Sequence, residues 1–381
     1  MKRTRTLPLL AGFLVLGIQS ASGRVQDQER PAPAQSQEVE IAVEDQDVVL
    51  AGTILLPAGA TPERPVAGVV LITGSGPQDR DESLMGKKPF KVLAEGLVEH
   101  GYAVLRYDDR GTLGIGIGKS TGSFAGSTTV DFAIDAAAAV DYLAAHPAVD
   151  ASKIIVCGHS TGGLVTAKLL GQNKVPAAAV LLASPSVIGW ELLAYQSDKI
   201  LRVTDEHQPT GLTPEQIDEM DQLQTEMIRS VAVGTEAQQR DAARAAIEFN
   251  VRLSGTDPAA LTDEIMDTAI AQALAPMQET WMAYFMRYDP AEDLGSARVP
   301  VLAIFGGRDL QVAPEQNMQP MSEHIRAAND NHSAVMVLET SNHLFQHAET
   351  GLLTEYATAG DPMEPLLIDL VAAWLNRVLA E

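Results

Sequence analysis

The feature that most restricts the fold of this chain is a regular alternation of short apolar runs with helix-like segments. Six runs rich in Val, Ile and Leu are the expected core strands: Val66–Thr73, Ala103–Tyr107, Lys153–Cys157, Ala177–Ala183, Val299–Phe305 and Ala334–Leu338. Four segments between and after them are the expected helices: Pro89–His100, Thr129–Ala145, Thr161–Gln172 and Met363–Leu379. Continuous apolar runs are typical of strands buried on both faces of a parallel sheet. The pattern predicts an α/β fold, a mostly parallel sheet flanked by helices, with Val48–Leu56 as an antiparallel edge strand.

Residues 187–290 interrupt this alternation. The segment is rich in Glu, Gln, Ala and Met and holds no strand-like run. Because one expected strand precedes it and another follows, we predict an inserted helical cap, with the α/β core formed by residues 41–186 and 291–381. In open parallel sheets, ligands bind outside the carboxyl ends of the strands, so an insertion leaving from such an end would roof the ligand site.

A glycine-rich turn, Gly158–Gly163, follows the expected strand Lys153–Cys157 and reads Gly-His-Ser-Thr-Gly-Gly. In a strand–turn–helix elbow, flanking glycines leave room for a strained serine backbone and the serine hydroxyl is exposed. Serine becomes a useful nucleophile only when a neighbouring base accepts its proton. We therefore predict Ser160 as the nucleophile, with an ordinary glycine-rich turn as the alternative.

The partners that such a serine needs follow it in the chain, each in the loop after an expected strand. Asp309 comes after the strand that ends at Phe305, and His343 comes after the strand that ends at Leu338. The order Ser, Asp, His is the one found with this type of elbow. We predict that His343 accepts the serine proton and that Asp309 orients the imidazole. The chain offers alternatives for the base and for the acid: His347, and Glu339 or Asp293.

An oxyanion that develops during attack on a carbonyl group needs two preorganised N–H donors. The amide of Thr161, just after the expected nucleophile, is one candidate. The other should come from the loop after the strand Val66–Thr73, where the sequence Gly-Ser-Gly-Pro lets the backbone approach closely. We predict the Ser75 amide, with Gly76 as second choice and an ordinary glycine turn as the alternative.

Neither a nucleotide site nor a metal site is expected. Gly118-Lys119-Ser120 resembles the end of a phosphate-binding loop, but position 113, where that motif needs glycine, is Leu. A dinucleotide-type spacing that starts at Gly114 fails at Lys119. The single cysteine, Cys157, cannot form an internal disulfide, and no Cys/His cluster has zinc spacing. We expect chemistry without a cofactor.

As an ordered set, five stretches of this chain resemble the α/β-hydrolase superfamily, and more narrowly the EstD-type bacterial carboxylesterases, also described as serine-aminopeptidase-like or dienelactone-hydrolase-like. They are Gly74–Asp81, Arg106–Gly111, Gly158–Gly163, Gly307–Val312 and Asn342–Gln346. The resemblance implies an α/β-hydrolase fold and the hydrolysis of small esters with short to medium acyl chains through an acyl-enzyme. It covers nearly the whole chain after the N-terminal segment.

One stretch departs from the family pattern, because Thr112–Ile117 lengthens the loop that follows Arg110-Gly111. Its glycines predict a mobile loop near the rim of the pocket, so the size of the substrate is not predicted. The charged residues in 79–81 and 108–110 are interpreted as ion pairs that fix loops, with a role in substrate binding as the alternative. For the substrate pocket we predict His159, Trp281 and Phe285; the alternative for the two cap residues is a place in an ordinary apolar core.

The first residues are typical of an export signal. Three cations, Lys2, Arg3 and Arg5, precede the apolar run Leu7–Ile18, and small residues follow at Ala21–Gly23. We predict a signal peptide over residues 1–23, cleaved after Gly23, a disordered leader over residues 24–40, and a periplasmic or secreted protein. Because the run is too short to span about 30 Å of hydrocarbon comfortably, stable membrane insertion is not expected after cleavage; an uncleaved anchor is the alternative.

The net charge of −23 restricts the partners. Loss of residues 1–23, which carry three cations and no anion, would leave a mature chain of net charge −26. Such a surface repels phosphate backbones, so nucleic acid is not an expected partner. The leading hypothesis is a carboxylic-ester hydrolase. An aminopeptidase or other amidase, and a non-catalytic exported binding module on the same scaffold, are the alternatives.

Overall fold

A computed structural model describes residues 35–175, 177–326, 332–360 and 362–380 of the chain. Within these residues the chain divides into two compact units. One is an α/β unit made of residues 35–187 and 289–380, and the other is the helical segment Ile188–Tyr288. The predicted signal peptide and the first part of the predicted leader lie outside the described residues. The cap's predicted position over a ligand site stays a prediction.

The α/β unit contains an eight-stranded sheet with the order β1-β2-β4-β3-β5-β6-β7-β8. The strands are β1 Gln35–Val43, β2 Val48–Leu56, β3 Val66–Ile72, β4 Ala103–Tyr107, β5 Val149–His159, β6 Ala178–Leu182, β7 Val301–Gly306 and β8 Ala334–Leu338. Strand β2 pairs antiparallel with β1 and with β4, and every other neighbouring pair is parallel. The six apolar runs therefore form the parallel part of the sheet, as predicted.

Two predictions for the first strands are wrong. The antiparallel edge strand is β1, whereas β2 is an inner strand between β1 and β4. Strand β1 also starts at Gln35, inside the range 24–40 predicted to be disordered. In this strand Ile41 and Val43 are buried against the sheet while Gln and Glu residues face outward, and Val43 pairs with Val48 at the turn. The many polar side chains on the outer face hid the period-two pattern of an edge strand.

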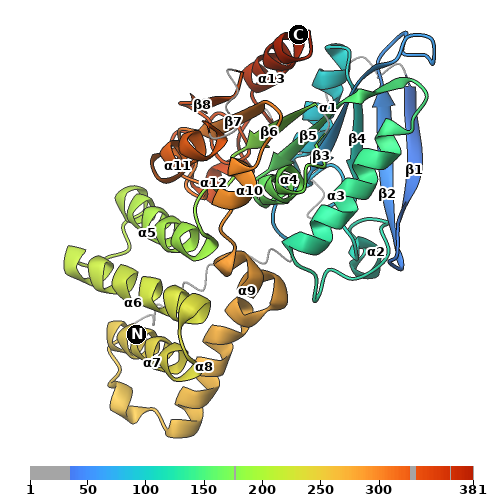
Figure 1. Cartoon of the computed structure of the whole chain (residues 1–381). Helices are drawn as coiled ribbons and strands as arrows, with labels where there is room; N and C mark the ends of the chain where they lie inside the picture. The colour runs from blue at the N-terminus through green and yellow to red at the C-terminus, as the bar shows by residue number, and fades with distance from the viewer. Residues whose placement is uncertain (1–34, 176, 327–331, 361, 381) are drawn as a thin grey trace. The chain divides into compact units, whose positions relative to one another are not determined.

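Helices cover both faces of the sheet (Figure 1). Helices α1 (Pro89–Glu99) and α13 (Pro365–Val378) lie on one face and share a core with alternate side chains of β3 and β5. Helices α3 (Thr129–Ala144), α4 (Thr161–Gly171), α10 (Ala291–Gly295) and α11 (Pro314–Arg326) pack on the opposite face. Two short helices, α2 (Thr112–Ile115) and α12 (Leu353–Tyr356), lie in loops. Because β3 to β8 are parallel, their carboxyl ends meet at one edge, where Ser160, Asp309 and His343 follow β5, β7 and β8.

The helical unit consists of α5 (Gly189–His207), α6 (Pro214–Val233), α7 (Glu236–Leu253), the short 3-10 helix η1 (Pro258–Ala260), α8 (Asp263–Gln278) and α9 (Thr280–Arg287). Thr213 and Thr235 begin α6 and α7 with capping boxes. Arg287 of α9 donates hydrogen bonds to the carbonyls of Val231 and Ala232, which ties α9 to the end of α6. No helix in the described part of the chain is both long and apolar enough to cross a membrane.

Candidate active site

Ser160 stands at a sharp turn between β5 and α4. Its backbone is left-handed, with φ 54° and ψ −122°, which is a strained conformation for a residue other than glycine. The neighbouring glycines are sterically required. A Cβ atom at Gly158 would lie 2.2 Å from the carbonyl oxygen of Gly162, and one at Gly162 would lie 2.3 Å from that of Ile72. The Gly-x-Ser-x-Gly pattern thus has a packing cause in this chain, and it holds the serine in place.

The structure brings the three predicted side chains together. His343 Nε2 lies 3.0 Å from Ser160 Oγ, and His343 Nδ1 lies 2.7 Å from Asp309 Oδ2. Their exposed fractions are 7% for Ser160, 5% for His343 and 1% for Asp309. Hydroxyl, imidazole and carboxylate therefore form one continuous hydrogen-bonded chain. In this arrangement the imidazole can accept the serine proton while the carboxylate stabilises the resulting imidazolium.

Asp309 is oriented by the loop after β7. Its Oδ1 accepts hydrogen bonds from the backbone amides of Gln311 (2.7 Å) and Val312 (2.9 Å), which leaves Oδ2 for His343. Gly306 and Gly307 permit this loop to lie directly against the histidine loop. A Cβ at Gly306 would be 2.4 Å from the carbonyl oxygen of Ser341. The carboxylate thus has one oxygen for the protein backbone and one for the imidazole.

The loop that carries His343 is closed by side-chain hydrogen bonds on both sides of the histidine. Asn342 Oδ1 accepts from the amides of Leu344 and Gln346, and Asn342 Nδ2 donates to Gln346 Oε1. Asn342 and Gln346 are both fully buried, and Phe345 has a positive φ of 56°. A loop bonded in this way keeps the imidazole in a fixed orientation. These hydrogen bonds explain why Asn342 and Gln346 accompany His343 in the motif.

The predicted oxyanion residues are also neighbours. Ser75 Oγ donates to Thr161 Oγ1 over 3.3 Å, so the loop after β3 meets the start of α4 beside Ser160. Thr161 is the first residue of α4, and the first N–H groups of a helix have no acceptor within the helix. Gly76 has a positive φ of 82°, as a tight turn requires. That the amides of Thr161 and of Ser75 or Gly76 bind an oxyanion stays a prediction.

The alternative residues lie elsewhere. The side chain of His347 is 71% exposed and faces Glu364 at 3.8 Å. Asp293 forms an ion pair with Lys168 at 2.7 Å, and Glu339 is exposed. By contrast, Ser160, His343 and Asp309 are in direct contact with one another through the imidazole of His343.

Sequence reasoning missed Glu82 and assigned His159 to the pocket wall, a role that stays a prediction. His159 is 5% exposed, and both of its ring nitrogens are bonded within the protein. Its Nδ1 lies 2.7 Å from Glu82 Oε1, and its Nε2 lies 2.9 Å from the carbonyl oxygen of His343. Burial alone would lower the pKa of His159, but the carboxylate of Glu82 and the two hydrogen bonds outweigh it and raise the pKa. A buried acid next to the Gly74–Asp81 motif is not recognisable from one sequence.

The two predicted cap residues belong to the helical unit. Trp281 stacks on Phe285 with ring centroids 5.4 Å apart and planes only 5° from parallel, and Phe285 is 3% exposed. This stack is part of the packing of α9 within its own unit. A role of Trp281 and Phe285 in a substrate pocket stays a prediction.

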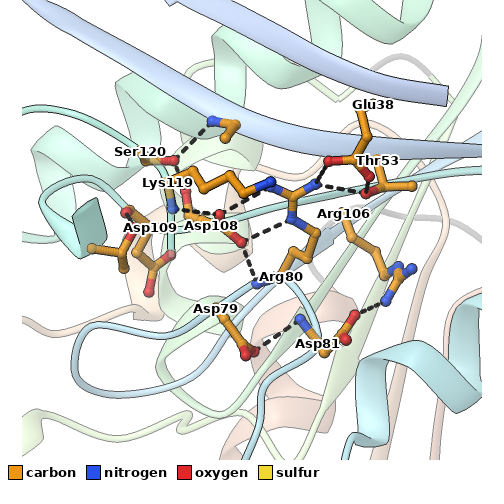
Figure 2. A network of polar contacts seen from close by, with 12 residues as sticks. Glu38, Thr53, Asp79, Arg80, Asp81, Arg106, Asp108, Asp109, Lys119 and Ser120 are labelled. Atoms are coloured by element: carbon orange, nitrogen blue, oxygen red, sulfur yellow. Dashed lines mark hydrogen bonds and ion pairs between the residues drawn. The ribbon is translucent and has the colours of Figure 1, made fainter. Parts of the chain in front are cut away.

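The charged residues around the two Asp-Arg motifs form what we call the arginine network: Arg80, Arg106 and Arg110 with Glu38, Asp81, Asp108 and Asp135 (Figure 2 shows the part around Arg80 and Arg106). Arg80 binds both oxygens of Asp108 and also reaches Glu38 and Thr53. Burial alone would raise the pKa of Asp108, but the hydrogen bonds from Arg80 outweigh it and lower the pKa. The ion-pair interpretation agrees with the contacts of Arg80, Asp81, Asp108 and Arg110. It does not describe Asp79, whose carboxylate accepts the backbone amides of Asp81 and Ser83.

Asp109 differs from its neighbours in this network because no arginine pairs with it. Its Oδ1 accepts from Thr73 Oγ1 (2.9 Å) and its Oδ2 from the amide of Gln78 (2.9 Å), which fixes the far end of the loop after β3. Burial raises the pKa of Asp109 to about 8, although both hydrogen bonds act in the opposite direction. Arg110 instead binds Asp135 with two hydrogen bonds of 2.6 and 2.7 Å.

The lengthened segment Thr112–Ile117 contains the short helix α2, ended by Gly116 at a positive φ of 74°. Leu113, Ile115 and Ile117 are each about half exposed. Thr112 is buried, and its carbonyl oxygen accepts hydrogen bonds from the amides of Ile117 and Gly118. These bonds join the two ends of the segment. Among the described residues, no group of three or more His, Cys, Asp or Glu side chains is placed to hold a metal ion.

The chain belongs to the alpha/beta hydrolase family, whose pattern matches residues 69–352. It is 26% identical over 340 residues to the esterase EstD of Thermotoga maritima, in an alignment that covers 88% of this chain and 68% of that protein. The resemblance inferred from the five sequence stretches is thereby confirmed.

Solved structures show the same fold. The Pyrococcus furiosus esterase Pf2001 superimposes with a TM-score of 0.51 at 17% identity and covers 91% of each chain. The alpha/beta hydrolase GrgF from Penicillium sp. sh18 gives a TM-score of 0.51 at 17% identity, covering 91% of this chain and all of that one. At such low identity these similarities support the α/β-hydrolase fold predicted from the sequence and nothing finer.

Proposed function

We propose that this protein is a serine carboxylesterase that cleaves small esters with short to medium acyl chains, with Ser160 as nucleophile, His343 as base and acid, and Asp309 as the orienting carboxylate. The observation that carries the proposal is the hydrogen-bonded chain in which His343 Nε2 lies 3.0 Å from Ser160 Oγ and Nδ1 lies 2.7 Å from Asp309 Oδ2. The similarity to EstD supports an ester as the substrate.

The reaction follows from these contacts in two halves. In the first, Ser160 Oγ adds to the ester carbonyl carbon while its proton passes to His343 Nε2, and the departing alkoxide takes that proton, leaving an acyl-serine. In the second, water attacks the acyl carbon and gives its proton to the same nitrogen. The carboxylic acid then leaves and Ser160 recovers its proton. The amides of Thr161 and of Ser75 or Gly76 would stabilise the oxyanion in both halves.

Replacement of the nucleophile tests the proposal directly. Ser160→Ala should lower kcat for p-nitrophenyl butyrate by about 10⁴-fold to 10⁶-fold, because one member of such a triad carries most of its effect. It should also abolish covalent labelling by a fluorophosphonate. Ser152→Ala, which removes an exposed hydroxyl bonded only to Asp150, is the matched control and should behave as wild type. Retention of more than a tenth of the activity by Ser160→Ala would refute the assignment.

The choice of substrate class has its own measurement. Wild-type rates on p-nitrophenyl acetate, butyrate and longer esters should exceed those on aminoacyl p-nitroanilides by at least about a hundredfold. A faster reaction with the anilides would replace the esterase by an amidase with the same triad. Failure of wild type to react with fluorophosphonate would instead favour a binding protein.

We also propose that the protein is exported. The basic residues, apolar run and small residues within 1–23 support this. Expression of the full chain in a bacterium with an outer membrane should place it in the periplasm or the medium, with Arg24 as its first residue. Retention of Met1 on the protein in the membrane fraction would show an uncleaved anchor.

A further inference from the structure

Glu82 is held in an unusual position inside the protein. It lies in the loop between β3 and α1, is 3% exposed, and has a positive φ of 53°. A left-handed backbone costs a residue other than glycine on the order of 1 kcal/mol, so other contacts must stabilise it. Asp79 supplies two of them by accepting the amides of Asp81 and Ser83. The result is a turn that directs a carboxylate inward.

The inward carboxylate meets two groups beside Ser160. Glu82 Oε1 accepts the amide of Gly74 over 2.8 Å and bonds His159 Nδ1 over 2.7 Å. Gly74 precedes the predicted oxyanion residue Ser75, and His159 precedes Ser160 in the elbow. A Cβ at Gly74 would lie 3.1 Å from Glu82 Oε1 and 3.3 Å from Ser160 Cβ, so glycine is needed for this close approach.

The opposite side of His159 reaches the base. His159 Nε2 lies 2.9 Å from the carbonyl oxygen of His343, and the two rings have centroids 4.8 Å apart. That carbonyl can only accept, so Nε2 must donate. Oε1 of Glu82 already accepts an amide proton, so a hydrogen bond at Nδ1 also calls for a proton between the two atoms. When that proton lies on Nδ1, both ring nitrogens are protonated and His159 is an imidazolium paired with the Glu82 carboxylate.

We infer that Glu82 and His159 form a buried positioning pair that fixes the Gly74 amide and the His343 carbonyl relative to the elbow, and so aligns the oxyanion loop and the base with Ser160. Neither residue touches the reacting atoms, and the inference rests on the proposed esterase function. It enlarges the site from three side chains to five. Phe90 and Phe345 enclose His159, with ring centroids 6.3 and 6.5 Å away. The pair therefore lies in an apolar surrounding in which an unpaired charge is costly.

The rate should respond to this pair because proton transfer depends on the distance between Ser160 Oγ and His343 Nε2. A misplacement of about 1 Å from a change outside the reacting groups can cost on the order of a hundredfold in rate. Because Glu82 and His159 are both buried, we expect the loss to appear in kcat, with KM nearly unchanged.

Two substitutions of His159 separate its two hydrogen bonds. In His159→Gln the side-chain amide reaches the place of Nε2 and can still donate to the His343 carbonyl. In His159→Asn it reaches the place of Nδ1 and can still donate to Glu82, while the bond to His343 is lost. Relative to His159→Ala, which loses both, we expect His159→Gln to recover at least about tenfold in kcat and His159→Asn to recover less.

The charge is tested separately by Glu82→Gln, which keeps the size of the side chain and an acceptor for the Gly74 amide. Without the carboxylate His159 becomes neutral and can donate from only one nitrogen. We expect kcat for p-nitrophenyl butyrate to fall about 10-fold to 100-fold, with KM within about threefold of wild type. Asp135→Asn, at a buried ion pair of the arginine network, is the matched control and should lower stability while the folded enzyme keeps its kcat.

These measurements can overturn the inference. A purely structural pair would lower the midpoint of thermal unfolding in all four variants without changing kcat at a temperature where each is folded. It would also give equal kcat values for His159→Gln, His159→Asn and His159→Ala. Either result, or a loss that appears mainly in KM, contradicts the positioning role. Variants that do not fold leave Glu82→Gln, the mildest change, to decide the question.

A last measurement needs no turnover and so separates this inference from the proposed function. In Ser160→Ala protein labelled with ¹⁵N-histidine, both ring nitrogens of His159 should carry protons at pH 8, where an ordinary imidazole is neutral. The signal is assigned by its loss in His159→Gln. A neutral His159 at pH 8 contradicts the paired imidazolium even if the esterase proposal holds, and a charged one supports it even if no ester is cleaved.

Discussion

Two groups of buried charged side chains lie in the α/β unit, and they differ in the cation that each carboxylate meets. In the arginine network the carboxylates of Asp81, Asp108 and Asp135 each face a guanidinium. In the second group, which we call the histidine group (Ser160, Asp309, His343, Glu82 and His159), Asp309 and Glu82 each face an imidazole. Guanidinium stays protonated at any ordinary pH, whereas imidazole exchanges its proton near neutrality.

The difference between guanidinium and imidazole suits the first group to fixing loops and the second to moving a proton. Arg80 donates to Asp108 with two nitrogens and to Glu38 with a third, so it holds three chain segments by charges that do not change (Figure 2). His343 has one nitrogen on Asp309 and one on Ser160, so it can accept a proton without losing its anchor. Buried carboxylates can thus either fix a loop or assist proton transfer, depending on whether they pair with a guanidinium or with an imidazole.

Among changes that keep the size of the side chain, the largest effect is expected where the hydrogen-bonded chain of Ser160, His343 and Asp309 is interrupted. In Asp309→Asn the carbonyl oxygen should face the amides of Gln311 and Val312, because both are donors. The new NH₂ group then faces His343 Nδ1 and forces the proton onto Nε2, which can no longer accept from Ser160. We expect kcat to fall about 10⁴-fold, measured with p-nitrophenyl butyrate.

The control for this change is the unfolding midpoint, which should shift by only a few degrees because packing is conserved. Labelling by a fluorophosphonate should slow by a similar factor as kcat. An Asp309→Asn enzyme within tenfold of wild type would show that the tautomer of His343 is not set by residue 309.

The corresponding change in the arginine network should affect stability and not rate. Asp135 is 1% exposed and receives two hydrogen bonds from Arg110, so Asp135→Asn removes the nearer carboxylate from a buried guanidinium and leaves only Asp131, at 3.8 Å, among its ion-pair partners in the described structure. Loss of one partner of a buried ion pair lowers the free energy of unfolding by about 3–5 kcal/mol. Because the new amide can still accept a hydrogen bond, we expect a loss of about 3 kcal/mol for this variant. Urea unfolding measures it. An unchanged midpoint, or a loss of kcat in folded protein, would remove the distinction between the two groups.

The sequence predicted the parts of the fold and site that depend on local pattern. Apolar runs located β3 to β8, because a strand buried on both faces needs continuous apolar sequence. The elbow was recognisable because only glycine fits so close to the neighbouring backbone at positions 158 and 162. The positions of Asp309 and His343 followed from the ends of β7 and β8. In each case a local physical requirement leaves a mark on the sequence.

The remaining features depend on contacts between distant segments. Glu82 is one of many acidic residues, and only the folded chain brings it to His159, 77 positions away. Strand β1 was missed because its outer face is polar, although Ile41 is buried. Asp109 belongs to a motif with Asp108, yet the structure gives Asp108 an arginine and Asp109 none. Neighbouring identical residues thus acquire opposite environments that no local pattern encodes.

Asp109 lies beside the arginine network but has no arginine partner, and it should make the stability of this region depend on pH. Its pKa is raised to about 8 in the folded protein, against about 4 unfolded. Between these values the unfolded chain has lost a proton that the folded chain keeps, so stability should fall as pH rises from about 4 to 8. The slope is about 1 kcal/mol per pH unit. In Asp109→Asn the amide can face the same partners, with its oxygen toward the Gln78 amide and its nitrogen toward Thr73.

Urea unfolding of wild type and Asp109→Asn at several pH values measures this slope. The difference in unfolding free energy should move in favour of the variant as pH rises from 5 to 8. Parallel pH curves for the two proteins would show that Asp109 does not change its protonation between pH 5 and 8.

The smallest effect is expected for an arginine that also pairs with two carboxylates but lies at the surface. Arg202 of α5 lies 2.6 Å from Asp198 and 2.9 Å from Asp218, with a side chain that is 48% exposed. Water and salt screen these charges, so Arg202→Gln should change the free energy of unfolding by less than about 1 kcal/mol. Urea unfolding at low and high salt measures it, beside Asp135→Asn. A loss as large as that of the buried variant would mean that the number of carboxylate partners, and not their burial, sets what an arginine contributes in this protein.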